Sequence, residues 1–566
     1  MSILKNSLKI TGLVIFVIIF IYFSTLSAKN LDKFNTVNNV SNYFSGILLL
    51  NDNKYDKSYN YLKRLEGLEE NHLNYSSKYL FSLVNLGKIN EAFIYSKKLE
   101  KKKISNFESD LIIGVYYLKN KKYDQAEVYF KKLKNKQSNF ILNDFLSDSL
   151  LNWISFDKND LTTSEKKINS IDEKFKNLKI IQNAFLHCFY DSEKTELYFN
   201  EISTNIKTDF SRYNYFYASF LLDSNKTRQA MNLVNSSLKL YPRNLLLNQL
   251  KLDLDKGKRK KNFNCKSISH VVAEIFYITA NALSSQNIYA FSNFYLNLSK
   301  YLNSDFFPFN SLLAENFFKI GNLEKSKKIY QELSKNGETY FWYSKKQIVK
   351  ILIDENKNKK ALNLINNSYK KLSEKGIYET YDYARFLKNN DQYEDSIKFY
   401  TDIIEKIDKD HPLYPKVTDG RGVSYERLGK WKKAEKDLLS SLSVSPNQAY
   451  VINYLAYSWI EQGVKIQKSL KMLEKANNLK SNDPFIIDSL GWALFKLKRY
   501  QDSKKFLQTA VMLMPADPVV NDHYGDVLWK SGNRIQARYY WKYVLNLKET
   551  EDDLKDKIKE KLISGI

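Results

Sequence analysis

The sequence has few of the residues that build turns and loops. Its 566 residues include only 17 Gly and 8 Pro, well below the usual share of either residue. A loop-rich or all-β protein of this length would carry far more of both. Aromatic side chains, in contrast, are abundant, with 41 Tyr and 34 Phe. So much large apolar surface excludes an intrinsically disordered protein.

Cysteine and catalytic motifs are equally scarce. The two cysteines, Cys188 and Cys265, exclude a disulfide-rich scaffold and a zinc site with four thiolate ligands. The sequence contains no H-E-x-x-H pair, G-x-S-x-G elbow, Walker-type loop or Rossmann glycine string. The nearest approach to an acid/base cluster is Asp522, His523 and Asp526. In a helix the two Asp share one face and His523 is turned off it, so we interpret the three as a surface cluster. We expect no enzyme, no metal site and no cofactor.

Negative charge is in deficit, since 88 Lys and Arg face 63 Asp and Glu and leave a formal net charge of +25. Such a balance raises the alternatives of a nucleic-acid binder or an anionic-lipid binder. The Lys residues are spread along the chain, however, and no nucleic-acid-binding signature occurs. We therefore interpret them as solvated surface, and the basic run 256–262 as a solvated loop rather than a contact with phospholipid or nucleic acid.

The first 28 residues read as an export signal. Lys5 and Lys9 precede the apolar run Leu13–Phe23, and small residues follow as far as Ala28. This order is typical of a secretory signal peptide cleaved near residue 28. The alternative is an uncleaved membrane anchor, because Ile10–Ala28 holds 19 residues without a charge, just enough to cross a bilayer. In both cases the body of the protein is exported.

The most informative feature is an internal repeat of 34 residues. The segment that begins at Pro484 carries Ile487, Leu490-Gly491, Leu494, Ser503, Leu507 and Ala510, and the segment that begins at Pro518 carries Asn521, Tyr524-Gly525, Leu528, Ala537, Trp541 and Val544. Related units begin near residues 39, 73, 107, 211, 307, 342, 377, 415 and 449, with degenerate units in 145–210 and 269–306. This pattern resembles the tetratricopeptide repeat (TPR) family.

The resemblance implies an all-α fold, a right-handed superhelical solenoid of about 12–14 TPR helical hairpins. Small residues at positions eight and twenty let the two helices of a hairpin approach closely, and large residues fill the space around them. We expect an N-terminal array over 39–244, a basic connector over 245–268, a C-terminal array over 269–551 and a polar tail over 552–566. Because each repeat of a solenoid touches only its neighbours, we expect Cys188 and Cys265 not to reach disulfide distance.

In the TPR family, positions two, five, nine and twelve of the first helix line a concave groove. The residues that this carry-over assigns to a partner-binding groove are Asp419, Glu426, Asn453, Tyr457, Asp488, Trp492, Phe495, Asp522, Asp526 and Trp529. Such a groove is acidic and aromatic, and suits a polypeptide with Lys or Arg and an apolar anchor. The alternative is that Asp488 and Asp522 cap or charge the early turns of their helices.

The C-terminal third carries a more specific resemblance, through the blocks Asn453–Trp459, Asp488–Trp492 and Asn521–Trp529. These blocks resemble large exported TPR proteins of Gram-negative bacteria, alphaproteobacteria especially. A related group includes an adaptor lipoprotein of a periplasmic processing protease. The resemblance implies a non-catalytic scaffold in the cell envelope, periplasmic or anchored to the inner membrane, which binds a protease or an assembly complex. No Cys follows the apolar run, so the sequence gives no lipoprotein anchor.

Overall fold

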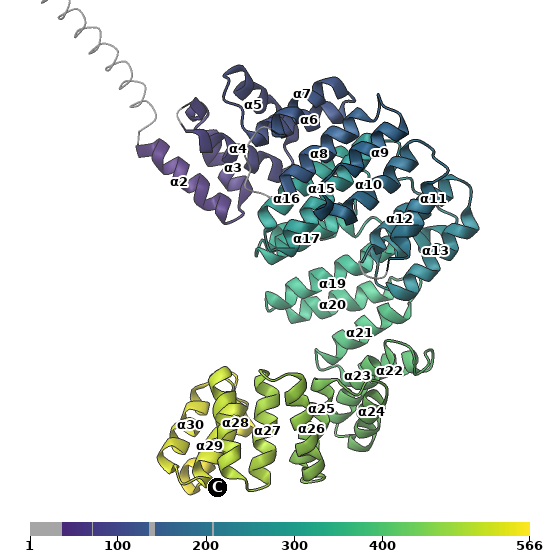
Figure 1. Ribbon diagram of the computed structural model, residues 1–566. Helices are drawn as coiled ribbons and strands as arrows, with labels where there is room; N and C mark the ends of the chain where they lie inside the picture. The colour runs from purple at the N-terminus through teal and green to yellow at the C-terminus, as the bar shows by residue number, and fades with distance from the viewer. Residues whose placement is uncertain (1–36, 71, 135–141, 206–208) are drawn as a thin grey trace, which may run out of the picture. The chain divides into compact units, whose positions relative to one another are not determined.

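The computed structural model describes residues 37–70, 72–134, 142–205 and 209–566 (Figure 1). Within these ranges the chain forms 30 α-helices, α2 to α31, and no β-strand. The predicted export signal over 1–28 lies outside the described residues. In the part of the chain that is described, no helix is both long and apolar enough to cross a membrane.

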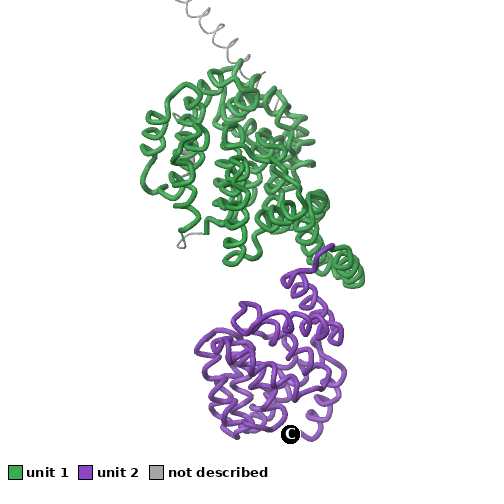
Figure 2. Tube along the Cα trace, turned by 90° about the vertical axis from the view of Figure 1, so that its right-hand side faces the viewer, with its two compact units in different colours: residues 1–372 green, residues 373–566 purple. Residues whose placement is uncertain are grey.

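The helices divide into two compact units, one up to Leu372 and one from Ser373 onward (Figure 2). Unit 1 contains nine hairpins and the single helix α14 (Leu245–Asp255). Its hairpins are α2 (Val37–Asn51) with α3 (Tyr55–Lys63), α4 (Leu73–Asn85) with α5 (Ile89–Lys101), α6 (Phe107–Lys119) with α7 (Tyr123–Lys134), α8 (Leu142–Ser155) with α9 (Leu161–Asn169), α10 (Lys176–Phe189) with α11 (Thr195–Ser203), α12 (Ser211–Asp223) with α13 (Thr227–Leu240), α15 (Ile268–Ser285) with α16 (Tyr289–Leu302), α17 (Phe309–Lys319) with α18 (Leu323–Leu333), and α19 (Glu338–Asp354) with α20 (Asn358–Lys370).

Unit 2 contains five hairpins and the single helix α31 (Asp552–Ser564). Its hairpins are α21 (Ile377–Lys388) with α22 (Tyr393–Ile404), α23 (Tyr414–Arg427) with α24 (Trp431–Val444), α25 (Ala449–Glu461) with α26 (Ile466–Leu479), α27 (Pro484–Lys496) with α28 (Tyr500–Leu513), and α29 (Pro518–Lys530) with α30 (Arg534–Asn546). The prediction of an all-α repeat solenoid is therefore confirmed. The degenerate stretches 145–210 and 269–306 also form hairpins, which brings the described total to fourteen.

Small residues at positions eight and twenty join the two helices in several hairpins, as the repeat pattern predicts. In α27 and α28, the Ser503 hydroxyl donates a hydrogen bond of 2.7 Å to the carbonyl oxygen of Gly491, twelve residues earlier. The same bond joins Ser58 to Gly46 and Ser326 to Ala314. A Cβ atom on Gly491 would lie 2.7 Å from the side chain of Leu507, so the helices can approach this closely only because position eight is glycine.

The segment 245–268, which we expected to connect two arrays, lies inside unit 1. It begins with α14, which packs on α12, α13 and α19. The Gln249 side chain accepts a hydrogen bond of 3.1 Å from the backbone nitrogen of Thr339, ninety residues later. Residues 256–267 form a loop, as predicted, and its basic run is exposed. Lys256 pairs with Glu338 at 3.1 Å, so part of that charge is neutralised locally.

Unit 1 also departs from the expectation that each repeat touches only its neighbours. Helix α16 contacts α4 and α6, and α15 contacts α8 (Figure 1). Lys119 donates a hydrogen bond of 3.0 Å to the carbonyl oxygen of Leu302, and the ring of Phe81 stacks on that of Phe294 at 5.5 Å. Most buried apolar side chains of unit 1, between Leu50 and Ile351, therefore form one continuous cluster, whereas those of unit 2 form several separate clusters.

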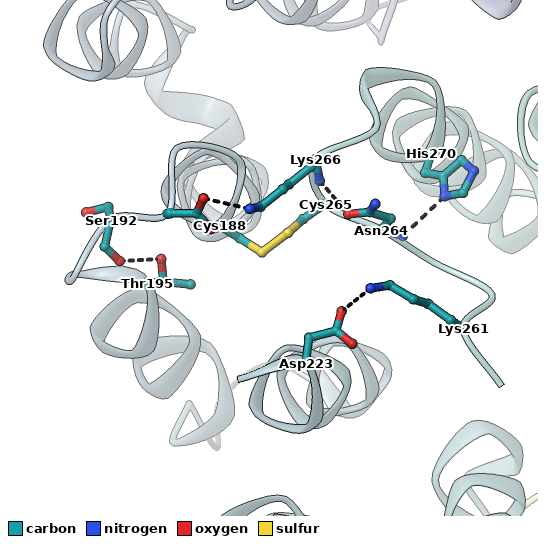
Figure 3. Close-up of a disulfide and its surroundings, with 10 residues drawn as sticks. Cys188, Ser192, Thr195, Asp223, Lys261, Asn264, Cys265, Lys266 and His270 are labelled. Carbon is teal, nitrogen blue, oxygen red and sulfur yellow. Dashed lines mark hydrogen bonds and ion pairs between the residues drawn. A yellow bond between two sulfur atoms is a disulfide. The ribbon is translucent and has the colours of Figure 1, made fainter. Parts of the chain in front are cut away.

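This return of the chain corrects the expectation for the cysteines. Cys188 on α10 and Cys265 form a disulfide, with Cα atoms 5.9 Å apart (Figure 3). The loop 256–267 crosses back over α10 and α12, where the ring of Phe263 lies 4.5 Å from that of Phe216. Lys266 pairs with Asp191 at 2.6 Å beside the disulfide. The prediction was wrong because sequence separation measures distance only in a linear stack, and unit 1 is not linear.

The predicted polar tail is wrong as well, because residues 552–564 form helix α31. The helices α27, α29 and α31 begin at Pro484, Pro518 and Asp552, each 34 residues after the one before. Helix α31 therefore takes the place of the first helix of one more repeat. Ile558 is fully buried against unit 2, and most charged side chains of the helix, Lys561 excepted, are exposed.

Candidate partner-binding groove

The ten predicted groove residues all lie on the first helices of four consecutive hairpins of unit 2, α23, α25, α27 and α29. Their spacing of three, four or seven residues places the members of each helix on one face. The structure brings the residues of α27 and α29 into one connected network. Those of α23 and α25 have separate partners.

The centre of the network is a buried ion pair between neighbouring repeats. Nδ1 of His523 on α29 lies 3.0 and 3.1 Å from the two carboxylate oxygens of Asp488 on α27. The imidazole also stacks on the ring of Trp492 at 3.9 Å, and Trp492 donates a hydrogen bond of 2.6 Å to Glu461. Trp492 stacks on Phe495 at 4.7 Å. The expectation that Asp522, His523 and Asp526 form a surface cluster is therefore wrong, because α27 covers the imidazole.

The surroundings of His523 favour its protonated form. Burial alone acts to lower the pKa of this imidazole, but the charge of Asp488 and the hydrogen bond to it, aided by Asp522 and Asp526, raise the pKa above its usual value. A protonated His523 neutralises Asp488 inside the protein. The Asp488 carboxylate is consequently not available to bind a cationic group of a partner.

The chain itself occupies the C-terminal end of the predicted groove. Nζ of Lys561 on α31 lies 2.6 Å from the Asp522 carboxylate and 2.8 Å from that of Asp526. Asp526 also accepts a hydrogen bond of 3.0 Å from the indole of Trp541. Burial, and after it the charge of Asp522, raises the pKa of Asp526 to about 6, although Lys561 acts in the opposite direction.

Trp529 lies at the same end and is half-buried. Its ring is 5.4 Å from that of Trp541 and carries the guanidinium groups of Arg534 and Arg538 at 5.2 and 4.8 Å. A Cβ atom on Gly565 would clash with the Trp529 ring, so the backbone after α31 lies directly against it. Three of the ten predicted residues, Asp522, Asp526 and Trp529, thus bind the chain's own C-terminal helix.

The N-terminal end of the groove has a different character. Burial raises the pKa of Asp419 to about 6, while the charge of Lys388 on α21 acts to lower it. Glu426 accepts a hydrogen bond of 2.5 Å from the hydroxyl of Tyr454 on the next repeat. Among the described residues, no hydrogen-bond partner faces the buried Oδ1 of Asn453. Tyr457 is half-buried, with its ring 6.4 Å from that of His523.

Of the alternative that Asp488 and Asp522 cap or charge the early turns of their helices, the capping part is wrong. The N-caps of α27 and α29 are Asp483 and Asp517, whose carboxylates accept hydrogen bonds from backbone nitrogens of the first turn. Asp488 and Asp522 lie a full turn further on, where they bind His523 and Lys561 instead. Both helices therefore have dedicated caps, and the buried Asp residues serve contacts between repeats.

Three of these first helices also carry an exposed apolar side chain near their N-terminus, alongside charged side chains that are exposed as well. Tyr450, Phe485 and Val519 occupy the second positions of α25, α27 and α29, and all three are exposed. Position two is one of the groove positions, but the sequence-based choice of residues omitted it. In residues 552–566, the spacing of Leu554, Ile558 and Leu562 predicts an amphipathic helix, although we expected a polar tail there.

In the described part of the chain, no group of His, Cys, Asp and Glu side chains is arranged to hold a metal ion. The carboxylates of Glu426, Asp488, Asp522 and Asp526 bind side chains of neighbouring helices, so they hold repeats together.

Comparison with known proteins agrees with the repeat architecture. No protein-family model matches the chain. A TPR-repeat-containing protein of Pseudomonas aeruginosa is 29% identical over 143 residues, which cover 25% of this chain and 23% of that relative. The chain thus spans about a quarter of the relative's length. This match and the fourteen hairpins support a relationship to TPR proteins, whose fold suits a scaffold for protein–protein interaction.

Several solved structures are similar to part of the chain. A thermophilic TPR protein of Thermus thermophilus is 13% identical and covers 33% of this chain and 100% of its own, with a TM-score of 0.29. A TPR protein of Parabacteroides merdae is 14% identical and covers 39% of this chain and 86% of its own, with a TM-score of 0.32. MamA of Desulfovibrio magneticus is 16% identical and covers 31% and 99%, with a TM-score of 0.27.

Proposed function

We propose that the chain is a non-catalytic scaffold of the bacterial cell envelope that binds a polypeptide partner along the first helices of unit 2. The observation that carries the proposal is the row of equivalent exposed side chains Tyr450, Phe485 and Val519, one on each of three consecutive first helices. Half-buried Tyr457 and Phe495 lie on the same helices. Aromatic side chains held on rigid helices are favourable anchors for a partner.

The partner is a segment with apolar side chains rather than a strongly basic one. His523 already pairs with the carboxylate of Asp488, and Lys561 with those of Asp522 and Asp526. A basic peptide would have to displace these buried partners, at a cost of several kcal/mol. Apolar side chains, in contrast, gain from covering Phe485 without displacing anything.

Export is supported by two independent features. The sequence of residues 1–28 has the order of charge, apolar run and small residues that export signals share, and the Cys188–Cys265 disulfide belongs to a class of bond that persists in oxidising compartments. An adaptor of an envelope protease or of an assembly complex is the role that the resemblance of the C-terminal third supports. The tethered form differs only in that the N-terminal segment stays in the membrane.

The binding proposal is tested by capture of partners from an envelope extract on the immobilised full chain. Phe485→Asp with Val519→Asp changes only exposed groove side chains, whereas substitution of Asp488 or Asp522 would leave a buried His or Lys unpaired. Met512→Asp is a matched control, because Met512 is exposed at the end of α28, outside the first helices.

We expect the wild-type chain and the control to enrich the same polypeptide, and the groove variant to lose it. Equal enrichment by all three chains, or by none, would refute binding along the groove. Cell fractionation tests the location, and the mass of the mature N-terminus separates the two envelope forms. A chain that begins at Met1 is the tethered form, and one that begins near residue 29 is the secreted form.

A further inference from the structure

The first and last described helices of the repeat array, α2 and α31, differ in the polarity of their exposed faces. A solenoid needs a polar outer face on its terminal repeats to stay soluble. At the C-terminal end α31 provides one, with exposed Asp552, Asp553, Asp556, Lys557 and Lys559. At the N-terminal end α2 has no charged residue among its fifteen.

Helix α2 instead exposes a row of apolar side chains, which we call the α2 stripe. Val37 is 85% exposed, Val40 44%, Phe44 61% and Leu48 66%. Their spacing of three, four and four residues places them on one face of the helix. So many large apolar side chains on one helix face mark a surface that another phase or molecule covers.

The opposite face of α2 is firmly held. Gly46 and Leu50 are buried, and a Cβ atom on Gly46 would lie 2.7 Å from the side chain of Leu62 on α3. The Ser58 hydroxyl donates a hydrogen bond of 2.8 Å to the Gly46 carbonyl oxygen. The ring of Tyr43 lies 4.7 Å from that of His72. The α2 stripe is therefore displayed by a helix that is fixed in place, and it cannot turn inward.

We propose that the α2 stripe docks on the surface of an anionic lipid bilayer. A helix without charge enters the interface between head groups and acyl chains without burying an ion. The basic character of the chain, with a net charge of +25, favours an anionic surface, which attracts Lys and Arg within about a Debye length. Residues 29–64, which flank and include α2, hold six Lys or Arg and three Asp.

The sequence before α2 places a membrane within reach. Only eight residues separate Ala28, the end of the uncharged run, from Val37. Even fully extended they span at most about 29 Å. If the uncharged run stays in a bilayer, α2 begins close to the surface of that bilayer. If the run is removed, the α2 stripe still exposes Val37, Val40, Phe44 and Leu48.

A second copy of the chain is a less suitable occupant. A helix of fifteen residues is about 22 Å long and, at a diameter of about 10 Å, offers roughly 220 Å² on one face. A stable interface between two proteins buries about 800 Å² on each partner. A lipid surface has no such threshold, because every apolar side chain that enters it contributes independently.

The test uses a site-specific dye. Among the described residues both cysteines are joined in the disulfide, and the sequence has no others, so a single introduced thiol reacts selectively. Leu48→Cys places the dye on the α2 stripe. Leu197→Cys on α11 is the matched control, because Leu197 is 64% exposed and α11 lies away from α2 within unit 1 (Figure 1).

The full chain, labelled with an environment-sensitive dye, is mixed with vesicles of phosphatidylcholine with and without phosphatidylglycerol. We expect emission from position 48 to shift to the blue and to be quenched by bromine atoms on the acyl chains, most strongly in the anionic vesicles. Emission from position 197 remains that of a dye in water. The double variant Val40→Asn with Phe44→Asn is expected to abolish the shift at position 48, even where the N-terminal segment holds the chain on the vesicle.

Three results overturn the proposal. The first is a dye at position 48 that stays open to aqueous quencher on chains bound to vesicles. The second is a failure of the chain to bind anionic vesicles at all. The third is a blue shift at position 48 that grows with protein concentration in the absence of lipid, which would assign the stripe to a second copy. None of these results bears on partner capture by unit 2, so the two proposals fail separately.

Discussion

Reduction of the Cys188–Cys265 disulfide is expected to destabilise unit 1 and to leave unit 2 unchanged. The bond joins residues 77 positions apart and fixes the loop 256–267 on α10. A cross-link that closes a loop of this length removes about 15 cal/mol/K from the entropy of the unfolded chain, or about 4.5 kcal/mol at 25 °C. Measured effects fall below this limit because unfolded chains retain structure. We therefore expect a loss of about 2–4 kcal/mol in the free energy of unfolding of unit 1.

The assay is denaturant unfolding followed by hydrogen exchange, read peptide by peptide with and without a phosphine reductant. Peptides of α10, α12 and α15 report on unit 1, and peptides of α27 and α29 provide an internal control. The double variant Cys188→Ala with Cys265→Ala should match the reduced wild-type chain and should not respond to reductant. Unchanged protection of α10 in a chain shown to be fully reduced would refute the reasoning. Two titratable thiols in the unreduced native protein would refute the bond itself.

Three further predictions concern unit 2. Because the pKa of His523 is raised in the folded state, its ion pair with Asp488 stabilises unit 2 below the unfolded pKa of about 6.5 and is lost as pH rises through the folded pKa; His523→Gln should flatten this part of the stability profile, measured by thermal unfolding between pH 5 and 9. Lys561→Met leaves two buried carboxylates unpaired and should cost about 3 kcal/mol at pH 7, but less at pH 5, where Asp526, with a pKa of about 6, takes up a proton; an equal loss at both pH values in denaturant titrations would contradict this account. Gly491→Ala forces a methyl group against the facing helix and should cost about 1–3 kcal/mol, whereas a neutral result in the same titrations would show that the two helices separate easily.

The individual hairpins could be predicted because each depends on residues only twelve positions apart, in a pattern that recurs every thirty-four residues. Gly491 and Ser503 mark one hairpin by themselves, and the bond between them needs no other part of the chain. The hairpins of 145–210 lack most of these markers, yet they form, because packing between neighbours compensates for a weak local pattern. The positions of the first helices of unit 2 could be predicted because their repeats carry these local markers.

The candidate site was predicted less well, because its chemistry depends on contacts between repeats. The sequence assigns Asp488 to the groove, but its partner His523 lies 35 positions away on the next first helix. His523 lies off the groove face of α29, but it still reaches the first helix of the preceding repeat, α27. Lys561 was missed because residues 552–566 are so polar that they resemble a tail. Their apolar residues Leu554, Ile558 and Leu562 are few, although their spacing is helical.

The disulfide could not be predicted at all from a linear arrangement of repeats. It depends on the return of 256–267 across α10, and that return depends on how small rotations between hairpins accumulate over unit 1. This accumulated rotation cannot be inferred from any single pair of residues in the sequence. Cys188 and Cys265 were therefore assigned to distant positions by a rule that fails in unit 1.

The contacts of α15 and α16 with α4, α6 and α8 also determine how the two units fold and vary. In an open array, stability is close to a sum of repeat and neighbour terms, and hairpins can unravel one at a time. Unit 2 has this form. In unit 1 the pairing of segments 180 or more residues apart requires a long loop to close first, which raises the contact order and slows folding. Loss or gain of a single hairpin between α6 and α15 would break this closure, so unit 1 cannot change its number of repeats without refolding as a whole, whereas unit 2 can.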